Sequence, residues 1–180
     1  MKIITVILSF TVWLFTAGCT AENPEFKVTI DETVKELDLN RYLGKWYEIA
    51  RFDHSFERGL VGATANYSLT EDGKIKVVNT GYKGSFDGKF NQAEAKAYRP
   101  SEKYPGALRV SFFLFFYSDY WVLDLDENYT FALVGSKSDK YLWILSRTPE
   151  MVPADLERLL NRAESLGYNT GNLIWVEHGK

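Results

Sequence analysis

The feature that most constrains the fold is a series of eight short apolar runs, separated by turn residues at intervals of about ten to fifteen positions. Turn signals between them include Glu71-Asp72-Gly73 and Tyr104-Pro105-Gly106. Runs of this length and spacing are typical of an antiparallel sandwich or barrel. The eight expected strands are Lys45–Phe52, Gly62–Leu69, Lys74–Tyr82, Gln92–Tyr98, Leu108–Phe113, Tyr120–Asp126, Tyr129–Gly135 and Tyr141–Arg147.

After Pro149 the pattern changes to that of an amphipathic helix. One apolar stripe recurs at helical spacing, formed by Leu156, Leu159, Leu160, Ala163 and Leu166. Pro153 stands near the expected first turn and Gly167 just past the end, as helix start and stop rules require. Residues 173–176 are expected to form one more short strand. We therefore predict an all-β fold: an eight-stranded antiparallel up-and-down β-barrel with one C-terminal helix packed outside.

The first eighteen residues have a different character from the rest of the 180-residue chain. Lys2 precedes an apolar stretch from Ile3 to Phe15, which small residues follow. A charged start, a short apolar stretch and a small-residue region predict a secretory signal over residues 1–18, too short for a comfortable membrane span. Residues 19–36 are polar and aperiodic, and predict a tether to a barrel domain over residues 37–180.

Cys19 is the only cysteine, so the chain can form no internal disulfide. It is either an incidental thiol or a lipid anchor. Ala17-Gly18-Cys19 resembles the lipobox of bacterial lipoproteins, in which the signal is cut before a cysteine that carries acyl chains. Thr20 stands where an Asp would resemble the inner-membrane retention signal. We therefore expect acylation of Cys19 and anchoring to the bacterial outer membrane, facing the periplasm.

Alternation within the strands indicates a hollow barrel rather than a filled one. In the run from Ala93 to Ala97, alanines alternate with charged residues, so the alanines face inward. Ala63 and Ala65 share a face with Tyr67. A filled small barrel needs bulky inward side chains, so repeated inward alanines leave space for a ligand.

Three motifs resemble those of the lipocalin family. The run from Asn40 to Arg51, built around Gly44 and Trp46, is similar to the family's opening motif. An Asp followed three residues later by Tyr, at Asp126 and Tyr129, resembles the second, and the run around Arg147 resembles the third. The resemblance covers roughly residues 37–176. Together with the lipobox it is strongest to the bacterial, outer-membrane branch of the family.

The resemblance implies a barrel closed at one end, where Arg147 packs over the indole of Trp46 in a cation–π contact. The residues expected to build this base are Gly44, Trp46, Asp126, Tyr129 and Arg147. Alternation from Trp46 places Glu48 inward, with a partner that the sequence does not identify. The residues expected to line the interior, or calyx, are Ala50, Ala65, Tyr67, Ala93, Ala95, Val110, Phe112, Tyr120, Leu133, Tyr141 and Trp143.

The segment SFFLFFYSDYW at residues 111–121 is expected at the open end of the barrel, the mouth. Phe115 and Phe116 are adjacent, so one face of a strand cannot hide both rings. Either they are exposed at the rim, or the hairpin folds over the barrel and buries them. The cations expected around the mouth are Arg51, His54, Arg58, Lys83, Lys89, Lys137 and Lys140, interspersed with acidic residues.

The resulting function hypothesis is the binding, storage or transport of fatty acids or lysophospholipids in the calyx at the outer membrane, with a possible homodimer. A structural or interaction module of the envelope, and a carrier of another hydrophobic ligand such as a tetrapyrrole, remain as alternatives. The chain has two histidines and no recognised catalytic motif, so we expect no enzyme activity, no cofactor and no metal site. A net charge of −3 argues against nucleic-acid binding.

Overall fold

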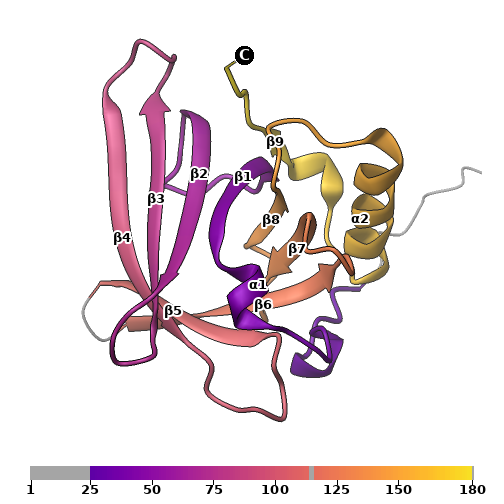
Figure 1. Cartoon of the computed structure of the whole chain (residues 1–180). Helices are drawn as coiled ribbons and strands as arrows, with labels where there is room; N and C mark the ends of the chain where they lie inside the picture. Colours follow the sequence, from indigo (N-terminus) through magenta and orange to yellow (C-terminus); the bar gives the residue numbers. More distant parts are fainter. Residues whose placement is uncertain (1–24, 114–115, 180) are drawn as a thin grey trace, which may run out of the picture.

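A computed structural model describes residues 25–113 and 116–179, and they form a closed antiparallel barrel (Figure 1). Neighbouring strands pair in the order β2-β3-β4-β5-β6-β7-β8-β1-β9, and a β1–β2 pairing closes the barrel. The predicted eight-stranded fold is confirmed, with a short ninth strand added to β1. The strands are β1 (Gly44–Arg51), β2 (Leu60–Leu69), β3 (Ile75–Lys83), β4 (Phe90–Tyr98), β5 (Ala107–Phe113), β6 (Phe116–Leu125), β7 (Phe131–Gly135), β8 (Leu142–Ser146) and β9 (Ile174–Trp175).

Two α-helices flank the barrel: α1 (Leu39–Tyr42) precedes β1, and α2 (Pro153–Ser165) follows β8. The carboxylate of Asp38 caps α1 by accepting from the first backbone N–H groups of the helix. Figure 1 shows α2 outside the barrel, on the side of β7 away from β2, β3 and β4. Leu159 and Ala163 are its buried residues, as the apolar stripe predicts. None of the helices among the described residues is long and apolar enough to cross a membrane.

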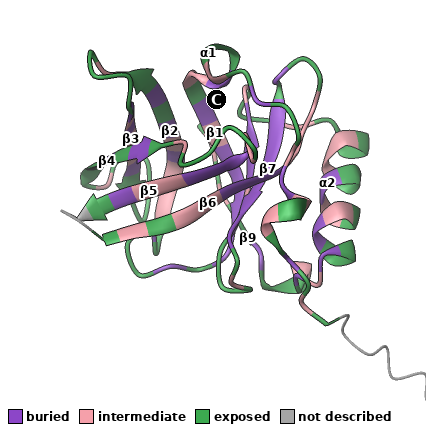
Figure 2. Cartoon of the chain, turned by 90° about the horizontal axis from the view of Figure 1, so that it is seen from below, coloured by how far each residue is buried: buried purple, intermediate pink, exposed green. Residues whose placement is uncertain are grey.

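The barrel wall has an outer core and an inner core. The outer core joins α2 to the outward side chains of β1, β6, β7 and β8, and includes Ile49, Leu123 and Ile144. The inner core lies inside the barrel and includes Trp46 and Val122. Figure 2 shows the buried residues running along β1, β6 and β7, while the ends of β5 and β6 are exposed. One half of the barrel is therefore packed on both faces, and the other is open to solvent.

Residues 25–36 pack against the barrel and do not form the free tether that their polar sequence predicts. Val28 and Thr33 are buried, and the ring of Phe26 lies 5.0 Å from that of Tyr168. The backbone N–H of Val34 donates to the carbonyl oxygen of Val122 at 2.9 Å. Short 3₁₀ turns lie at Ile30–Glu32 and at Thr170–Asn172. The predicted signal and Cys19 lie outside the described residues.

Two residues expected in the calyx face outward instead. Ala50 belongs to the outer core because the β1–β8 register shifts between Glu48 and Ala50, which reverses the alternation counted from Trp46. Leu133 also belongs to the outer core, while its neighbours Ala132 and Val134 fill the inner one. All residues of β7 are buried, so no contrast between polar and apolar residues reveals its inner face.

The closed end of the barrel is built around Trp46 and Arg147. The Arg147 guanidinium lies 3.8 Å from the centre of the Trp46 ring, and donates to the carbonyl oxygens of Arg41, Tyr42, Lys45 and Tyr129. The Trp46 indole N–H donates to the Tyr42 carbonyl oxygen at 2.8 Å. These contacts satisfy chain ends that would otherwise leave unpaired carbonyl groups, so the role of both residues is structural.

Glycine and aspartate complete this end. Gly44 adopts φ of 91°, which an L side chain rarely adopts, and a Cβ there would lie 3.4 Å from Arg147 Nη1. Asp126 accepts hydrogen bonds from the backbone N–H groups of Asn128, Thr130 and Phe131, and so fixes the turn before β7. Tyr129, in this turn, has φ of 60°, and its hydroxyl accepts from the Asp38 N–H at 2.9 Å.

Candidate functional site

The barrel encloses two adjoining chambers of about 340 and about 300 Å³. They share wall residues, among them Glu48, Glu57, Asn79 and Val110. The wall of the larger chamber is mostly apolar, with Ala65, Tyr67, Ile75, Val77, Ala97, Leu108, Val134 and Leu145 among its residues. Each chamber alone lies at the lower end of the volumes that small-molecule sites have.

Most of the expected calyx residues lie on the walls of these chambers. The larger chamber is lined by Ala65, Tyr67, Val110, Phe112, Tyr120, Tyr141 and Trp143, and the smaller by Ala93 together with Val110 and Phe112. Ala93 is exposed to solvent inside the smaller chamber, whereas Ala95 is buried in the inner core and lines neither. Alternation therefore located the cavity face of β4 and β8 but not the depth of each residue.

Three tyrosine hydroxyls meet on the inner side of the base. The Tyr120 hydroxyl lies 2.8 Å from that of Tyr42 and 2.8 Å from that of Tyr67. Burial raises the pKa of all three phenols above the ordinary value of 10.0. The three groups therefore satisfy one another as neutral hydroxyls, and this part of the cavity carries no charge.

One side of the cavity carries buried charged groups from β1 and the loop that follows it. Glu48, Arg51 and Glu57 are 2%, 1% and 4% exposed. Arg51 Nη1 lies 3.2 Å from Glu48 Oε2, and Arg51 Nε lies 3.9 Å from Glu57 Oε2. Arg51 is therefore the partner of Glu48 that the sequence did not identify. It was expected among the mouth cations, which is wrong, because the same register shift that moves Ala50 outward brings Arg51 inward.

The two carboxyl groups hold protons more tightly than exposed ones. Burial, and then the neighbouring Glu57 carboxylate, raise the pKa of Glu48 well above its ordinary value of 4.5, while Arg51 opposes the shift. Burial also raises the pKa of Glu57, against the Trp143 indole N–H that donates to its Oε2 at 3.1 Å. Two buried carboxylates beside one guanidinium leave one negative charge in excess, which a proton shared by the pair removes.

His54 belongs to an aromatic stack rather than to the mouth cations. Its ring centre lies 5.2 Å from that of Phe56, 5.1 Å from that of Tyr141 and 4.8 Å from that of Trp143. Burial, and then the nearby Arg51, lower the pKa of His54 to about 4. The expectation of a charged His54 at the mouth is therefore wrong: at neutral pH the imidazole is an uncharged ring.

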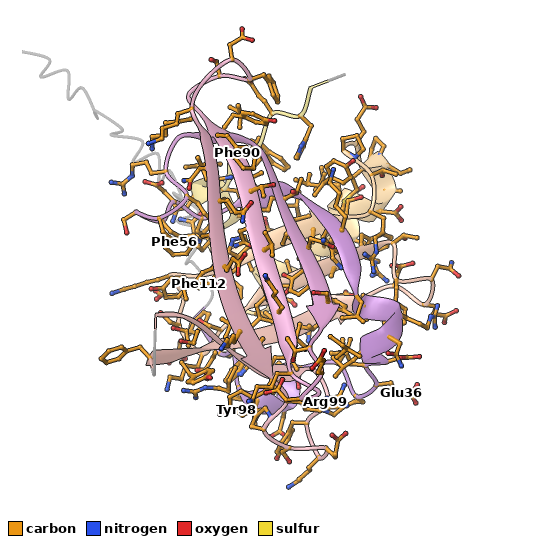
Figure 3. The ribbon with its side chains drawn as sticks, turned by 60° about the vertical axis from the view of Figure 1, so that its left-hand side comes forward. Glu36, Phe56, Phe90, Tyr98, Arg99 and Phe112 are labelled. Carbon is orange, nitrogen blue, oxygen red and sulfur yellow. The ribbon has the colours of Figure 1, made fainter. Side chains whose placement is uncertain are left out.

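The mouth carries exposed aromatic rings. Phe116 is 79% exposed and Phe112 is 41% exposed, and the Phe112 ring lies 5.8 Å from that of Phe56. Figure 3 shows Phe56 and Phe112 close together, far from Tyr98 and Arg99 at the other end of the sheet. Phe116 also lines the smaller chamber. Phe115 lies outside the described residues.

Several of the expected mouth cations have acidic or carbonyl partners. Arg58 lies 2.7 Å from Asp53, and Lys83 donates to the carbonyl oxygen of Arg58. Lys137 lines the larger chamber and lies 3.8 Å from Asp119. No group of three or more His, Cys, Asp or Glu side chains that could hold a metal ion occurs in residues 25–113 and 116–179.

Sequence reasoning missed Glu57 and Asn79 as parts of the cavity wall. Glu57 lies in the loop after β1, and its carboxyl group reaches inward because the loop folds back over the mouth, where the Glu57 carbonyl oxygen accepts from Arg51 Nη2 at 2.8 Å. Asn79 holds an inward position on β3, after Ile75 and Val77. Alternation counted from Val77 could have located Asn79, whereas no sequence pattern marks an inward loop residue such as Glu57.

Comparison with known proteins agrees with this architecture. A profile of the lipocalin-like domain matches residues 37–178. Outer membrane lipoprotein Blc of Citrobacter freundii is 43% identical over 177 residues, 98% of each chain, and that of Vibrio cholerae is 46% identical over 80% of this chain and 84% of its own. Among solved structures, insecticyanin from the tobacco hornworm Manduca sexta superimposes with a TM-score of 0.66 at 21% identity, covering 82% of this chain and 84% of the other.

These relatives confirm the expected location at the bacterial outer membrane. The profile match and the bacterial relatives together cover nearly the whole chain. The chain therefore belongs to the lipocalin family, whose members bind hydrophobic ligands in a barrel and are not enzymes.

Proposed function

We propose that the chain binds fatty acids or lysophospholipids in its calyx, and stores or carries them at the outer membrane. The observation that carries this proposal is the apolar wall of the larger chamber, which runs from the tyrosines at the base to the aromatic rings of the mouth. An acyl chain needs such a wall, with few polar groups along it. Its polar end then lies toward the mouth, where water and Lys137 are accessible.

The anchor forms the second half of the proposal. Acylation of Cys19 holds the barrel at the inner face of the outer membrane, facing the periplasm, close to a source of lysophospholipids and free fatty acids. Several acyl chains on one residue give stable anchoring, whereas one alone does not. The outer membrane lipoprotein relatives support this arrangement through their names. The possible homodimer stays a prediction.

The test compares two valine substitutions on neighbouring faces of the barrel. Val110 lines both chambers, whereas Val78 on β3 alternates with the cavity residues Val77 and Asn79 and lines neither chamber. Val110→Phe should weaken the binding of palmitate and of a palmitoyl lysophospholipid at least about tenfold, because overpacking a filled site costs roughly 1–3 kcal/mol. Val78→Phe should change both affinities by less than about twofold.

Both affinities are measured by quenching of tryptophan fluorescence, because Trp143 lies on the cavity wall. Melting temperatures show that both variants are folded. If the wild-type chain binds neither ligand, the proposed function is wrong. If folded Val110→Phe binds both as tightly as the wild type, the ligand does not occupy the calyx.

A further inference from the structure

Two carboxyl groups face the cavity, and the guanidinium that holds them lies behind them. Glu48 and Glu57 line both chambers, whereas Arg51 is 1% exposed and lines neither. Arg51 directs its Nη2 at the carbonyl oxygens of Glu57 and Leu60, at 2.8 and 3.2 Å. A ligand in the cavity therefore meets the carboxyl groups first and the positive charge only through them.

Hydrogen-bond acceptors exceed donors on this wall. Glu57 accepts from the Trp143 indole and, at 3.5 Å, from Asn79 Nδ2. Asn79 also lines both chambers, and its Oδ1 is buried without a hydrogen-bond partner. A buried acceptor without a donor is costly, so this wall favours a ligand that brings donors.

The excess negative charge points to the same kind of ligand. Two carboxylates and one guanidinium leave one charge to be neutralised, by a proton in the empty site or by a cation in the occupied one. An ammonium group brings a positive charge and up to three N–H donors. The aromatic rings of Phe56, Tyr141 and Trp143 line the larger chamber beside Glu57, and ring faces attract an ammonium group further.

We infer that Glu48, Glu57 and Asn79 form an internal acidic subsite, which binds the ammonium group of a single-chain amphiphile whose alkyl chain lies on the apolar wall. The inference rests on the proposed function and deepens it by assigning the headgroup. A carboxylate at this wall would meet like charges and acceptors, so the subsite selects against free fatty acids and for ammonium-bearing lipids.

Three probes of equal chain length isolate the headgroup: dodecylamine, dodecanol and dodecanoate, each titrated calorimetrically at pH 7 below its micelle concentration. Dodecylamine should bind at least about tenfold more tightly than dodecanol, and dodecanoate should bind least tightly. A tenfold ratio corresponds to about 1.4 kcal/mol. Equal affinities for all three probes would overturn the subsite while leaving the proposed function intact.

Proton release gives a second readout. The ammonium replaces the proton shared by Glu48 and Glu57, so titrations in two buffers of different ionisation enthalpy should show net release of protons with dodecylamine and none with dodecanol. Other groups that face the pair do not supply protons at pH 7. His54, with a pKa of about 4, is already neutral, Tyr67 and Tyr120 have pKa values raised well above 10.0, and Arg51 stays charged. Equal proton release with both probes would contradict the inference.

Variants then identify the residues. Glu57→Gln keeps the shape of the side chain and should remove most of the preference for dodecylamine over dodecanol. Asn79→Leu removes the buried acceptor without changing charge, and should reduce that preference by a smaller factor. Glu94→Gln is the matched control, because Glu94 lies on the outer face of β4 beside Lys76.

The outcomes separate two failures. If folded Glu57→Gln and Asn79→Leu both keep the wild-type preference, the subsite is wrong. If the wild type binds palmitate and lysophospholipid but shows no preference among the three dodecyl probes, the subsite is again wrong and the proposed function stands. If no amphiphile binds at all, the proposed function fails, and the subsite fails with it.

Discussion

At the scale of single residues, the unusual feature of this barrel is a set of ionisable side chains inside an apolar wall. Glu48 is buried beside Arg51 and Glu57, and the three share so few contacts with water that their charges depend on one another. Replacing such a set by apolar residues often leaves stability unchanged or raises it. Its presence here is therefore better explained by ligand binding than by stability.

The raised pKa of Glu48 predicts that the free energy of unfolding falls as pH rises. Its folded pKa lies above the ordinary value of 4.5, so the folded chain binds more protons than the unfolded chain from about pH 4.5 up to the folded pKa. The stability that Glu48 contributes is complete below this window and is lost across it. Glu48→Gln keeps the group uncharged, so the difference between wild type and variant should fall with rising pH, as measured by urea unfolding.

His54 has the opposite effect and must be separated from this. Its pKa is lowered from 6.5 to about 4, so it contributes stability above pH 6.5 that is lost as pH falls toward 4. The difference between wild type and Glu48→Gln removes this contribution, because both proteins keep His54. A difference that does not vary with pH would show that Glu48 titrates normally.

At the scale of elements, alternation predicted strands well and their inner faces unevenly. On β8, Trp143 and Leu145 face the cavity as counted back from Arg147, because no irregularity interrupts that short strand. On β1 one register shift reversed the last residues, moving Ala50 outward and Arg51 inward. A bulge is set by pairing with a neighbouring strand, which one strand's sequence does not reveal.

The C-terminal segment fills a gap that these irregularities leave between β1 and β2. The two strands pair only from Gly44 to Tyr47, and beyond that β9 pairs with Ala50 and Arg51 of β1. The carbonyl oxygen of Glu177 accepts from the Gly62 N–H on β2 at 2.7 Å. His178 Nε2 lies 2.8 Å from the Glu48 carbonyl oxygen. The segment thus joins both strands and covers the barrel wall beside Glu48.

Truncation after Val176 should therefore loosen this side of the barrel. It removes the bonds to Gly62 and Glu48, which together represent about 1–3 kcal/mol. The melting temperature should fall by several degrees, and the Gly62 amide should exchange its hydrogen faster. Truncation after His178 keeps both bonds and is the control. Equal exchange at Gly62 in the two truncated proteins would show that the segment does not hold β2.

At the scale of the whole molecule, sequence reasoning reached the fold because several independent signals agree: turn spacing, alternation, a terminal helix stripe and three motifs in order. It could not reach the boundary of the tether. Residues 25–36 have a polar, aperiodic sequence, yet Val28 and Thr33 are buried against a barrel that other segments build. Burial of so short a segment depends on the surface it meets, and no local pattern encodes that surface.

This boundary sharpens the prediction for the anchor. Because the ordered part begins at Glu25, the chain from Cys19 spans at most about 20 Å, so an acylated Cys19 would hold the barrel close to the membrane surface. Cys19→Ser should release the protein into the periplasmic fraction with an unchanged melting temperature, because no described contact of the barrel depends on residues before Glu25. Membrane association is measured after alkaline and high-salt washing, with the wild type as reference. Retention of Cys19→Ser in the washed membranes would show that another part of the chain binds the bilayer, and the lipobox assignment would then be wrong.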